Sequence, residues 1–480
     1  MLASKECRYV MGFMNYCSHD PGACLIQVNE NGELVDYIFT EEGFHSRRKK
    51  SYQFPLRSIK YCLDYFNLDF RDLDAICLDY MDTKRVHRTS NNYRLLIGDY
   101  IRANLDIGDK TKILFCESHH LAHAYSAFLA SDFKESAVLV VDGLGSEQQT
   151  HSFYKADETG FKLLSKQAGN GIGTLYTLIT QQIGFEAGEE GKTMGLAAYG
   201  EQHTDQDSIL PNLSAYTFKS TRDYSKQLTR NPSPTLKINI KDISKKEEIY
   251  SPYFTRLAYN LQDECERTLM HLSKECLCMS ESENLCLAGG VALNCVANER
   301  IAELVNNKLF VQPAAGDTGI PIGLALYGAE RLTGKMPRIN CSDDSDFAGP
   351  FFPYTSDKTN FINRRISQSL GFDVWDYIQN ISVNIDMHKI CNLLLKQKVG
   401  AIYHSAIEIG PRALGHRSFI ADCSDSKMKE VMNLKIKHRE AYRPFAPIVL
   451  ADKYSQYFSG SNCGIHSYML GAPKCTAKAE

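Results

Sequence analysis

The fold is decided by residues 112–145, which read KILFCESHHLAHAYSAFLASDFKESAVLVVDGLG. The apolar residues Ile113 to Phe115 predict a short strand, and the Ala- and Leu-rich run from His119 to Leu129 predicts a helix. A second strand, Ala137 to Val141, ends directly in Asp142-Gly143-Leu144-Gly145, and a further strand follows. An acidic residue and glycines at a strand end allow a sheet to present backbone N–H groups to a phosphate.

A similar unit opens the chain. Two predicted strands, Gly22 to Val28 and Leu34 to Phe39, flank a turn and form a hairpin. The residues His19-Asp20-Pro21-Gly22 lead into it, and a helix is predicted from Leu56 to Phe66 because apolar residues recur there at helical spacing. Two such hairpins, one early in each half, are a feature of actin-like ATPases, in which nucleotide lies between duplicated lobes. We therefore expect a duplicated actin-like (ASKHA) α/β domain.

Two domains are predicted along the chain. The actin-like domain is expected to cover residues 1–345, with a polar insertion at about 201–248. The stretch from Ile339 to Asp357, rich in Asp, Gly and Pro, is interpreted as a linker, and residues 346–480 as a separate α/β domain. Further predicted elements are a helix from about Tyr253 to Cys276, a strand from Asn284 to Ala288, a helix around Ile385 to Gln397 and a strand from Val399 to Tyr403.

The composition is that of a globular protein. Of the 480 residues, 43% are hydrophobic and 23% are charged, and the formal net charge of -3 gives no electrostatic footprint for nucleic acid. The 16 cysteines are scattered, often among apolar neighbours, which favours a reducing compartment. No apolar stretch reaches the roughly 18 residues that a membrane span needs. We expect a soluble, cytoplasmic protein that acts on a small molecule, without nucleic acid or membrane partners.

The spacing His119-x-x-x-His123 is the sharpest local signal. On a helix, residues four apart stand on one face, so both imidazoles can reach one divalent ion. Asp142, at a strand end, and Asp317, between glycines, are carboxylates that could complete the site. A purely structural pair of histidines on an Ala-rich helix remains an alternative to a metal site.

Several glycine clusters follow predicted strands and together suggest a nucleotide held by main-chain amides. The turn at Gly289-Gly290 is expected near the adenosine, with a helix that starts near Ala292 offering its N-terminus. Lys192, which follows Gly191, is a candidate positive charge for phosphate or substrate, although it could equally lie on a surface turn. The clusters are Gly169 to Gly173, Gly188 to Gly191, Gly289 to Gly290 and Gly316 to Gly319.

The segment from Glu408 to Leu450 is rich in cations placed among Gly, Pro and small residues. Arg offers a planar fork and Lys a point charge to phosphate oxygens, so this pattern predicts a polyanion pocket. A solvated basic face is the alternative, and we expect it less because an apolar strand is predicted at residues 444–450. The cations are Arg412, Arg417, Lys437 and Arg443.

These motifs resemble the O-carbamoyltransferase family, which includes nodulation-factor, cephalosporin and aminoglycoside carbamoyltransferases. In order and spacing they cover nearly the whole chain outside the insertion. The matching segments are His119 to Ala124, Val141 to Gly143, Gly191 to Ala197, Gly289 to Asn294, Gly316-Asp317 and Gly410 to Ser418.

The resemblance implies an actin-like domain followed by a YrdC-like domain. The second domain would make carbamoyl-adenylate from carbamoyl phosphate and ATP, and the first would transfer the carbamoyl group to a hydroxyl of a small molecule, a sugar or a glycan. By motif, a divalent metal, in this family usually Fe(II), would be bound by His119, His123, Asp142 and Asp317. Contacts to ATP and carbamoyl phosphate would come from Gly143, Gly289, Gly290, Asn294, Arg412, Arg417, Lys437 and Arg443. His120, Lys192 or a metal-bound water could assist proton removal.

The chain departs from the family pattern at three places. His416 stands where the family usually has Asn, and Pro21-Gly22 replaces Ala-Ser after His19-Asp20. The sequence ends at Glu480, where family members continue, so the YrdC-like domain is expected to be incomplete.

Three other functions remain open from the sequence. A threonylcarbamoyl-type tRNA-modifying transferase would share the first domain, and tRNA binding with a salt-dependent affinity would favour it. A sugar kinase of the same superfamily would transfer phosphate instead of carbamoyl. A non-catalytic nucleotide-binding scaffold predicts binding without turnover.

Overall fold

A computed structural model describes the chain at residues 7–14, 20–50, 53–79, 90–169, 171–200, 252–339, 349–350, 387–403, 405–461 and 463–479. The chain divides into two units. The first comprises Met1–Ala348, Ile409–Arg412 and Tyr442–Glu480, and the second Gly349–Glu408 and Ala413–Ala441. The domain ranges 1–345 and 346–480 stay a prediction. The predicted insertion at 201–248 lies outside the described residues, as do His19 and most of the predicted linker.

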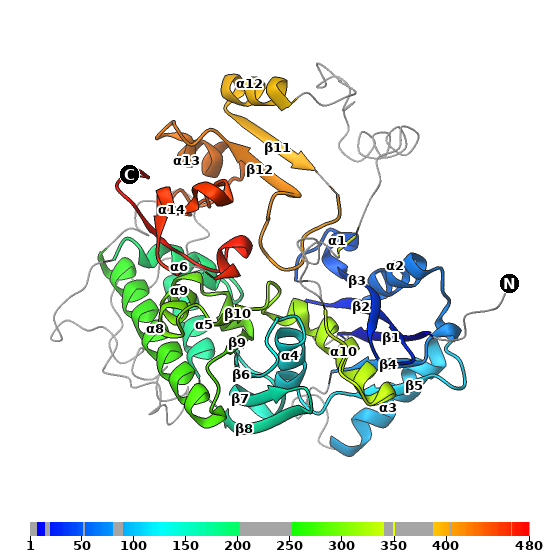
Figure 1. Cartoon of the computed structure of the whole chain (residues 1–480). Coiled ribbons are helices and arrows are strands. Elements are labelled where there is room, and N and C mark those ends of the chain that lie inside the picture. Colours follow the sequence, from blue (N-terminus) through cyan, green and yellow to red (C-terminus); the bar gives the residue numbers. More distant parts are fainter. Residues whose placement is uncertain are drawn as a thin grey trace. The chain divides into compact units, whose positions relative to one another are not determined.

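The first half of the first unit is built on a five-stranded sheet (Figure 1). Its strand order is β3-β2-β1-β4-β5, in which β3, β2 and β1 are antiparallel and β4 and β5 run parallel to β1. The predicted opening hairpin is therefore confirmed. The strands are β1 (Cys7–Phe13), β2 (Gly22–Asn29), β3 (Leu34–Glu41), β4 (Ala75–Leu78) and β5 (Lys112–Phe115).

The second half repeats this topology. Its sheet has the order β10-β9-β6-β7-β8, so that an antiparallel run of three strands is again continued by two parallel ones. The strands are β6 (Ser136–Val141), β7 (Gln149–Asp157), β8 (Gly160–Ala168), β9 (Leu285–Ala288) and β10 (Leu309–Val311). Because β8-β7-β6-β9-β10 corresponds strand for strand to β3-β2-β1-β4-β5, the predicted duplication of an α/β lobe is confirmed.

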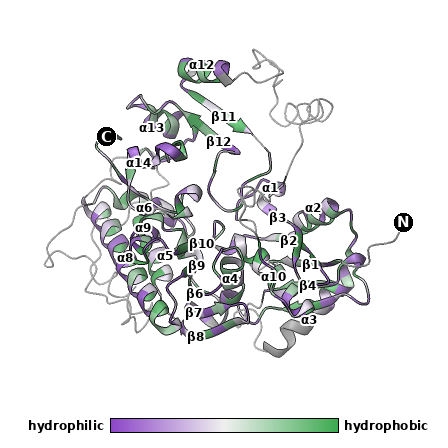
Figure 2. Ribbon diagram, in the orientation of Figure 1, coloured by the Kyte–Doolittle hydropathy of each residue, from purple (hydrophilic) through white to green (hydrophobic). Residues whose placement is uncertain are grey.

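Helices cover both sheets. Strands β4, β6 and β9 are buried along their whole length, as expected for strands covered on both faces. Figure 2 shows hydrophobic residues along the strands and along one side of the long helix α8. The helices are α1 (Glu42–Ser46), α2 (Leu56–Phe66), α3 (Ser90–Asn104), α4 (His119–Phe128), α5 (Ile172–Ile183), α6 (Glu190–Ala197), α8 (Pro252–Ser280), α9 (Cys295–Leu304) and α10 (Ile320–Thr333).

Helices α4 and α10 lie between the two sheets (Figure 1). One buried apolar cluster joins them to Val10 and Cys77 of the first sheet and to Val138 of the second. Glycine permits this close packing, because a Cβ on Gly323 of α10 would collide with the backbone of Ala122 in α4. The residues at the N-termini of α4 and α10 are thereby held close together.

Most of the predicted helices and strands are present within a few residues of their predicted ends. The start of α9 differs: residues 290–293 form a short 3₁₀ turn, and the α-helix begins at Cys295 with Asn294 as its N-cap. The predicted strand at residues 444–450 is wrong, since this stretch pairs with no strand in the described chain and Ile448 is 80% exposed. No strand at residues 444–450 therefore counts against a solvated basic face.

The second unit contains a two-stranded antiparallel sheet, β11 with β12. Its elements are α12 (Met387–Gln397), β11 (Val399–Tyr403), β12 (Arg417–Ala421), α13 (Met428–Val431) and a π-helical turn (Met432–Ile436). A YrdC-like fold for this part of the chain stays a prediction.

The C-terminal residues return to the first unit. His466 Nε2 lies 2.7 Å from Glu299 Oε2 on α9, and the Asn298 side chain donates to the carbonyl of Leu470. The elements here are a 3₁₀ turn (Ala451–Lys453), α14 (Tyr454–Tyr457), β13 (Phe458–Ser459), a second 3₁₀ turn (Gly464–Tyr468) and β14 (Lys474–Cys475). Among the helices described, none combines the length and the hydrophobicity needed to cross a bilayer.

Candidate metal centre

Helix α4 presents the two predicted histidine ligands from one face. The helix begins just after β5, and the Ser118 side chain caps it by accepting a hydrogen bond from the Leu121 N–H. His119 and His123 are both buried, with ring centroids 4.8 Å apart. The spacing of four residues therefore places both imidazoles on one side of the helix, as predicted.

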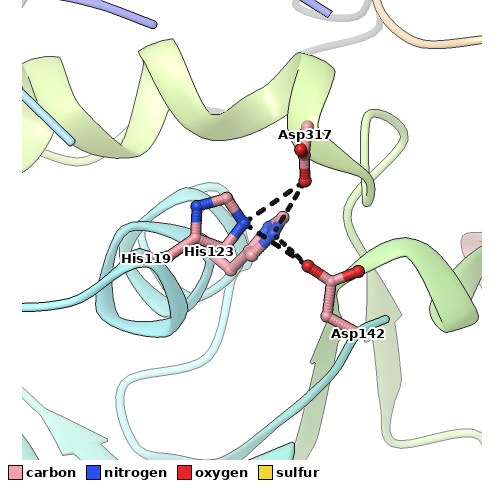
Figure 3. A group of neighbouring side chains, drawn as sticks. All are labelled: His119, His123, Asp142 and Asp317. Carbon is pink, nitrogen blue, oxygen red and sulfur yellow. Dashed lines mark hydrogen bonds and ion pairs between the residues drawn. The ribbon is translucent and has the colours of Figure 1, made fainter. Parts of the chain in front are cut away.

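Both predicted aspartates reach the same point (Figure 3). Asp142 follows the last residue of β6, and Asp317 begins the 3₁₀ turn that leads into α10. His119 Nε2 lies 3.4 Å from Asp142 Oδ2 and 3.3 Å from Asp317 Oδ1. The corresponding distances from His123 Nε2 are 3.5 Å and 3.7 Å. The four side chains thus each direct one ligand atom to a common centre.

The second oxygen of Asp142 fixes the orientation of its carboxylate. Asp142 Oδ1 accepts hydrogen bonds from the backbone N–H of Gly143 at 2.8 Å and of Gly290 at 3.2 Å. Gly289, with φ of +91°, brings this turn against the backbone of Val141, where a Cβ has no room. The N–H groups of Gly143 and Gly290 are thus directed at Asp142, and the expected contacts of these two residues with nucleotide stay a prediction.

A fifth residue, Asp79, completes the surroundings of His119. It follows the last residue of β4 and is 2% exposed, and its Oδ2 lies 2.8 Å from His119 Nδ1. The sequence interpretation missed it. The available signal was a carboxylate directly after a buried strand, which is also the position of Asp142.

Charges in this cluster shift the pKa of each member. Burial would lower the pKa of His119, but Asp79, Asp317 and Asp142 raise it well above its ordinary value. Burial is likewise outweighed at His123, whose pKa is raised by the neighbouring carboxylates of Asp142 and Asp317. The pKa of Asp142 and that of Asp317 are lowered, because the two histidines outweigh the effect of burial. The carboxylates of Asp142 and Asp317 are therefore stabilised by positive charge, which protons on the imidazoles or a divalent cation can supply.

The donor set fits a divalent transition metal. Two imidazole nitrogens and two carboxylate oxygens lie within 4.8 Å of one another. Neither ring nitrogen of His123 has a hydrogen-bond partner among the described residues, although the side chain is fully buried. A buried imidazole without hydrogen bonds is costly, and coordination would satisfy it. Mixed nitrogen and oxygen donors suit zinc, iron or manganese better than calcium or magnesium.

The two predicted proton acceptors differ in their surroundings. His120 is fully buried, with its Nδ1 2.8 Å from Ser152 Oγ, and its Nε2 has no partner in the described part of the chain. Burial lowers the pKa of His120 to about 3, so its ring is neutral. Lys192 on α6 instead forms an ion pair of 2.6 Å with Glu189 and lies over the ring of Phe185.

Asn294 lies in a network of buried amides. Its Oδ1 accepts from the Ala297 N–H and so caps α9, and its Nδ2 donates to Gln262 Oε1 of α8 at 2.9 Å. Gln262 Nε2 donates back to Asn294 Oδ1 at 3.1 Å. Asn294 therefore caps α9 and joins it to α8, and its contact with nucleotide stays a prediction.

The four predicted phosphate-binding cations are divided between the two units. In the first unit, Arg412 donates to the carbonyl of Leu293 at 3.2 Å, and Arg443 is half-buried. In the second, Arg417 donates to the carbonyls of His416 and Ser405 and lies 3.6 Å from the centroid of the Tyr403 ring. Lys437 Nζ lies 5.1 Å from the ring centroid of Phe419.

Glu408 organises the loop between Arg412 and β12 and was also missed from the sequence. Its Oε1 accepts from the backbone N–H groups of Leu414, His416 and Arg417 at 3.0, 2.7 and 3.0 Å. Burial would raise the pKa of Glu408, but these amides lower it. These three N–H groups therefore stabilise a carboxylate of the chain itself.

Comparisons with protein families give two matches. Residues 97–326 match the model described as the carbamoyltransferase N-terminus, and residues 391–480 match the one described as the carbamoyltransferase C-terminus. Together these ranges include the four residues of the cluster and all four predicted cations.

Curated relatives extend over most of the chain. The uncharacterized protein sll1178 of Synechocystis sp. is 32% identical, over 94% of this chain and 77% of its own length. Nodulation protein NolNO of Sinorhizobium fredii is 29% identical, over 92% of this chain and 64% of its own. Nodulation protein U of Rhizobium fredii is 25% identical, over 90% of this chain and 76% of its own length. The chain thus spans about two thirds to three quarters of these relatives.

Solved structures are similar only at a low level. Full-length HypF in a phosphate- and nucleotide-bound form matches 68% of this chain and 56% of its own, with 10% identity and a TM-score of 0.37. A ROK hexokinase from Thermus thermophilus covers 68% of this chain and 99% of its own, with 12% identity and a TM-score of 0.33. The strand order described above, rather than these scores, supports the duplicated fold.

Proposed function

The chain belongs to the carbamoyltransferase family, and from that premise we propose that it is a metal- and ATP-dependent O-carbamoyltransferase. It would form carbamoyl-adenylate from carbamoyl phosphate and ATP and transfer the carbamoyl group to a hydroxyl of a sugar or glycan. The observation that carries the proposal is the convergence of His119, His123, Asp142 and Asp317 on one centre. The nodulation proteins among the relatives support a glycan acceptor only by family resemblance.

The cluster would hold its ion from one side only. The side chains of His119 and His123 are buried, whereas those of Asp142 and Asp317 are 13% and 16% exposed. Space is also open beside Gly143, where a Cβ would meet no atom within 4 Å. We infer that the carbamoyl donor and the acceptor hydroxyl approach over the two carboxylates. A bound divalent ion would polarise the carbamoyl oxygen or the acceptor hydroxyl.

The chain's own groups would orient the reactants and move the proton. In the transfer, the acceptor oxygen forms a bond to the carbamoyl carbon, the bond from that carbon to the AMP oxygen breaks, and the hydroxyl proton leaves. His120 is neutral and offers an imidazole beside the cluster, whereas the charged Lys192 is paired with Glu189. We propose His120 rather than Lys192 as the residue that accepts the proton. Burial lowers the pKa of His120 to about 3 and makes it a weak base, so this role requires that its ring be uncovered first.

His120 needs a local movement for this role. Its Nε2 lies under Gly145, so close that a Cβ there would be 2.8 Å away. The turn from Asp142 to Gly145 would have to shift to bring a hydroxyl against this nitrogen. Ser152, whose Oγ lies 2.8 Å from His120 Nδ1, would hold the ring in place during that movement.

The proposal is tested with the whole chain, carbamoyl phosphate, ATP and Fe(II) under anaerobic conditions. AMP is quantified, and candidate sugars and glycans are examined by mass spectrometry for a carbamoyl ester. A second arm supplies carbamoyl-adenylate directly, which separates transfer from adenylation. We expect His123→Ala to abolish transfer in both arms, and His271→Ala, which alters an exposed histidine on α8, to leave it unchanged.

Each alternative has its own product. A phosphate ester on the acceptor would establish a kinase, and ligand binding without any product a scaffold. Salt-dependent binding of tRNA and its modification would establish the threonylcarbamoyl-type reaction. Absence of both AMP and carbamoyl ester in every arm would overturn the proposal.

A further inference from the structure

Asp79 stands outside the four predicted ligands but contacts one of them. It comes from the first half of the first unit, where it follows the last residue of β4, whereas Asp142 and Asp317 belong to the second half. Its Oδ2 lies 2.8 Å from His119 Nδ1, a shorter distance than any of the four between a histidine and an aspartate of the cluster. The contact therefore joins the first lobe to the candidate metal centre.

The geometry fixes which nitrogen of the neutral His119 ring carries the hydrogen. A carboxylate can only accept, so Nδ1 donates to Asp79, and once the ring has lost its second proton the lone pair of Nε2 is left for the common centre. His119 is 1% exposed and Asp79 is 2% exposed, so water does not compete for this hydrogen bond. Asp79 Oδ1 has no hydrogen-bond partner among the described residues. A buried carboxylate with a hydrogen bond to only one of its oxygens has a high free-energy cost, which a positive charge nearby would reduce.

From this contact we propose that Asp79 is a positioning residue that sets the metal affinity of the centre through His119. The ligand set of two neutral imidazoles and two carboxylates balances a divalent charge, and Asp79 adds one further negative charge behind His119. It makes the imidazole a stronger donor and holds the ring in the tautomer that can bind metal. This inference rests on the metal site proposed above, but not on the carbamoyl chemistry.

A purely structural hydrogen bond would behave differently. Its loss would lower the stability of the fold without changing the affinity or the electronic spectrum of a bound ion. The distinguishing measurements are therefore the dissociation constant for Co(II), obtained by competition with a chelator, and the ligand-field absorption of the Co(II) protein.

The test compares Asp79→Asn with a matched variant on the same strand. Asp74 precedes the other end of β4, where its Oδ2 accepts the Tyr9 N–H, and Asp74→Asn makes the same chemical change away from the centre. We expect Asp79→Asn to weaken Co(II) binding about 10- to 100-fold and to alter the absorption bands. Asp74→Asn should leave both unchanged.

Two outcomes would overturn the inference, and they are distinguishable. Equal Co(II) affinity and equal spectra in wild type and Asp79→Asn would remove the role of Asp79 while leaving the metal site intact. Failure of the wild-type chain to bind any divalent ion would remove the metal site and this inference together. If Asp79→Asn does not fold, ¹⁵N NMR of the histidines in the Zn(II)-loaded wild type shows which nitrogen of His119 is protonated and which is metal-bound. We expect a protonated Nδ1 and a metal-bound Nε2 on His119, and the opposite assignment would contradict the proposal.

Discussion

The backbone N–H of Gly290 donates a hydrogen bond of 3.2 Å to Asp142 Oδ1, across a sequence separation of 148 residues. The glycine turn after β9 therefore aims a carboxylate of β6 at the two histidines of α4. Because Asp142 Oδ2 faces His119 and His123, the position of the Gly290 amide bears directly on the metal centre.

Replacement of Gly290 by alanine tests this link. The added Cβ would lie 3.1 Å from Asp142 Oδ1 and would push the carboxylate aside. We predict that Gly290→Ala weakens Co(II) binding by about tenfold, as loss of an orienting contact usually does. The control is Gly98→Ala in α3, where a Cβ meets no atom within 4 Å. Equal affinities in the two variants would show that this amide does not orient Asp142.

Metal binding should be coupled to proton release. The carboxylates raise the pKa of His119 and of His123, so both imidazoles must lose protons before they can coordinate. The affinity is therefore expected to rise with pH until these raised pKa values are passed. Calorimetric titrations with Zn(II) in buffers of different ionisation enthalpy measure the protons released. An affinity that is flat between about pH 6 and 8 would refute this coupling.

Gly145→Ala tests the proposed role of His120. The new Cβ would lie 2.6 Å from His120 Cδ2, so the ring or the turn must move. We predict a fall of about 10- to 100-fold in kcat for carbamoyl transfer, because small displacements at a reacting centre are costly. Co(II) affinity should change little. Gly464→Ala, which meets no atom within 4 Å, is the control, and unchanged kcat in Gly145→Ala would exclude His120 as the proton acceptor.

The contact between Glu299 and His466 is expected to hold the C-terminal segment on α9. Glu299 Oε1 accepts the Ser461 N–H at 2.8 Å, and its Oε2 lies 2.7 Å from His466 Nε2. We predict that Glu299→Gln lowers the free energy of unfolding by about 1–3 kcal/mol, measured with urea. Glu303→Gln, an exposed position on the same helix, should have no measurable effect.

The effect of Glu299→Gln should also depend on pH. Burial would raise the pKa of Glu299, but His466 and Ser461 lower it below its ordinary value of 4.5. The stabilisation is therefore fully present above that value and is lost as the pH falls through the lowered pKa. Wild type and variant should converge in strongly acidic solution. A difference that grows toward acid pH would contradict this assignment.

The sequence predicted the candidate site better than it predicted the environment of that site. A spacing of four on a helix and a carboxylate directly after a strand are local features, so His119, His123 and Asp142 could be recognised from them. Asp317 could be recognised because its glycine neighbours mark a close approach. Asp79 was missed because its significance depends on the parallel pairing of β4 with β5, which places the end of β4 beside the start of α4 and so beside His119.

The roles of the loops could not be read from residue types alone. The phosphate contacts predicted for the cations near Gly410 to Ser418 stay a prediction. The residue types did not indicate that Arg412 and Arg417 donate to backbone carbonyls, or that Glu408 accepts hydrogen bonds from three N–H groups of the same loop. The apolar residues at 444–450 predicted a strand, yet Ile448 and Leu450 are exposed, because strand formation requires a partner that the sequence pattern does not specify.

The central claim is that four side chains hold one divalent ion, and anomalous diffraction tests it most directly. Crystals grown with Co(II) or Fe(II) would be measured on both sides of the metal's absorption edge. We predict one strong anomalous peak at about 2.0–2.2 Å from His119 Nε2, His123 Nε2 and one oxygen each of Asp142 and Asp317. The absence of a peak at this centre from crystals saturated with metal, or a peak bound by other residues, would contradict the account.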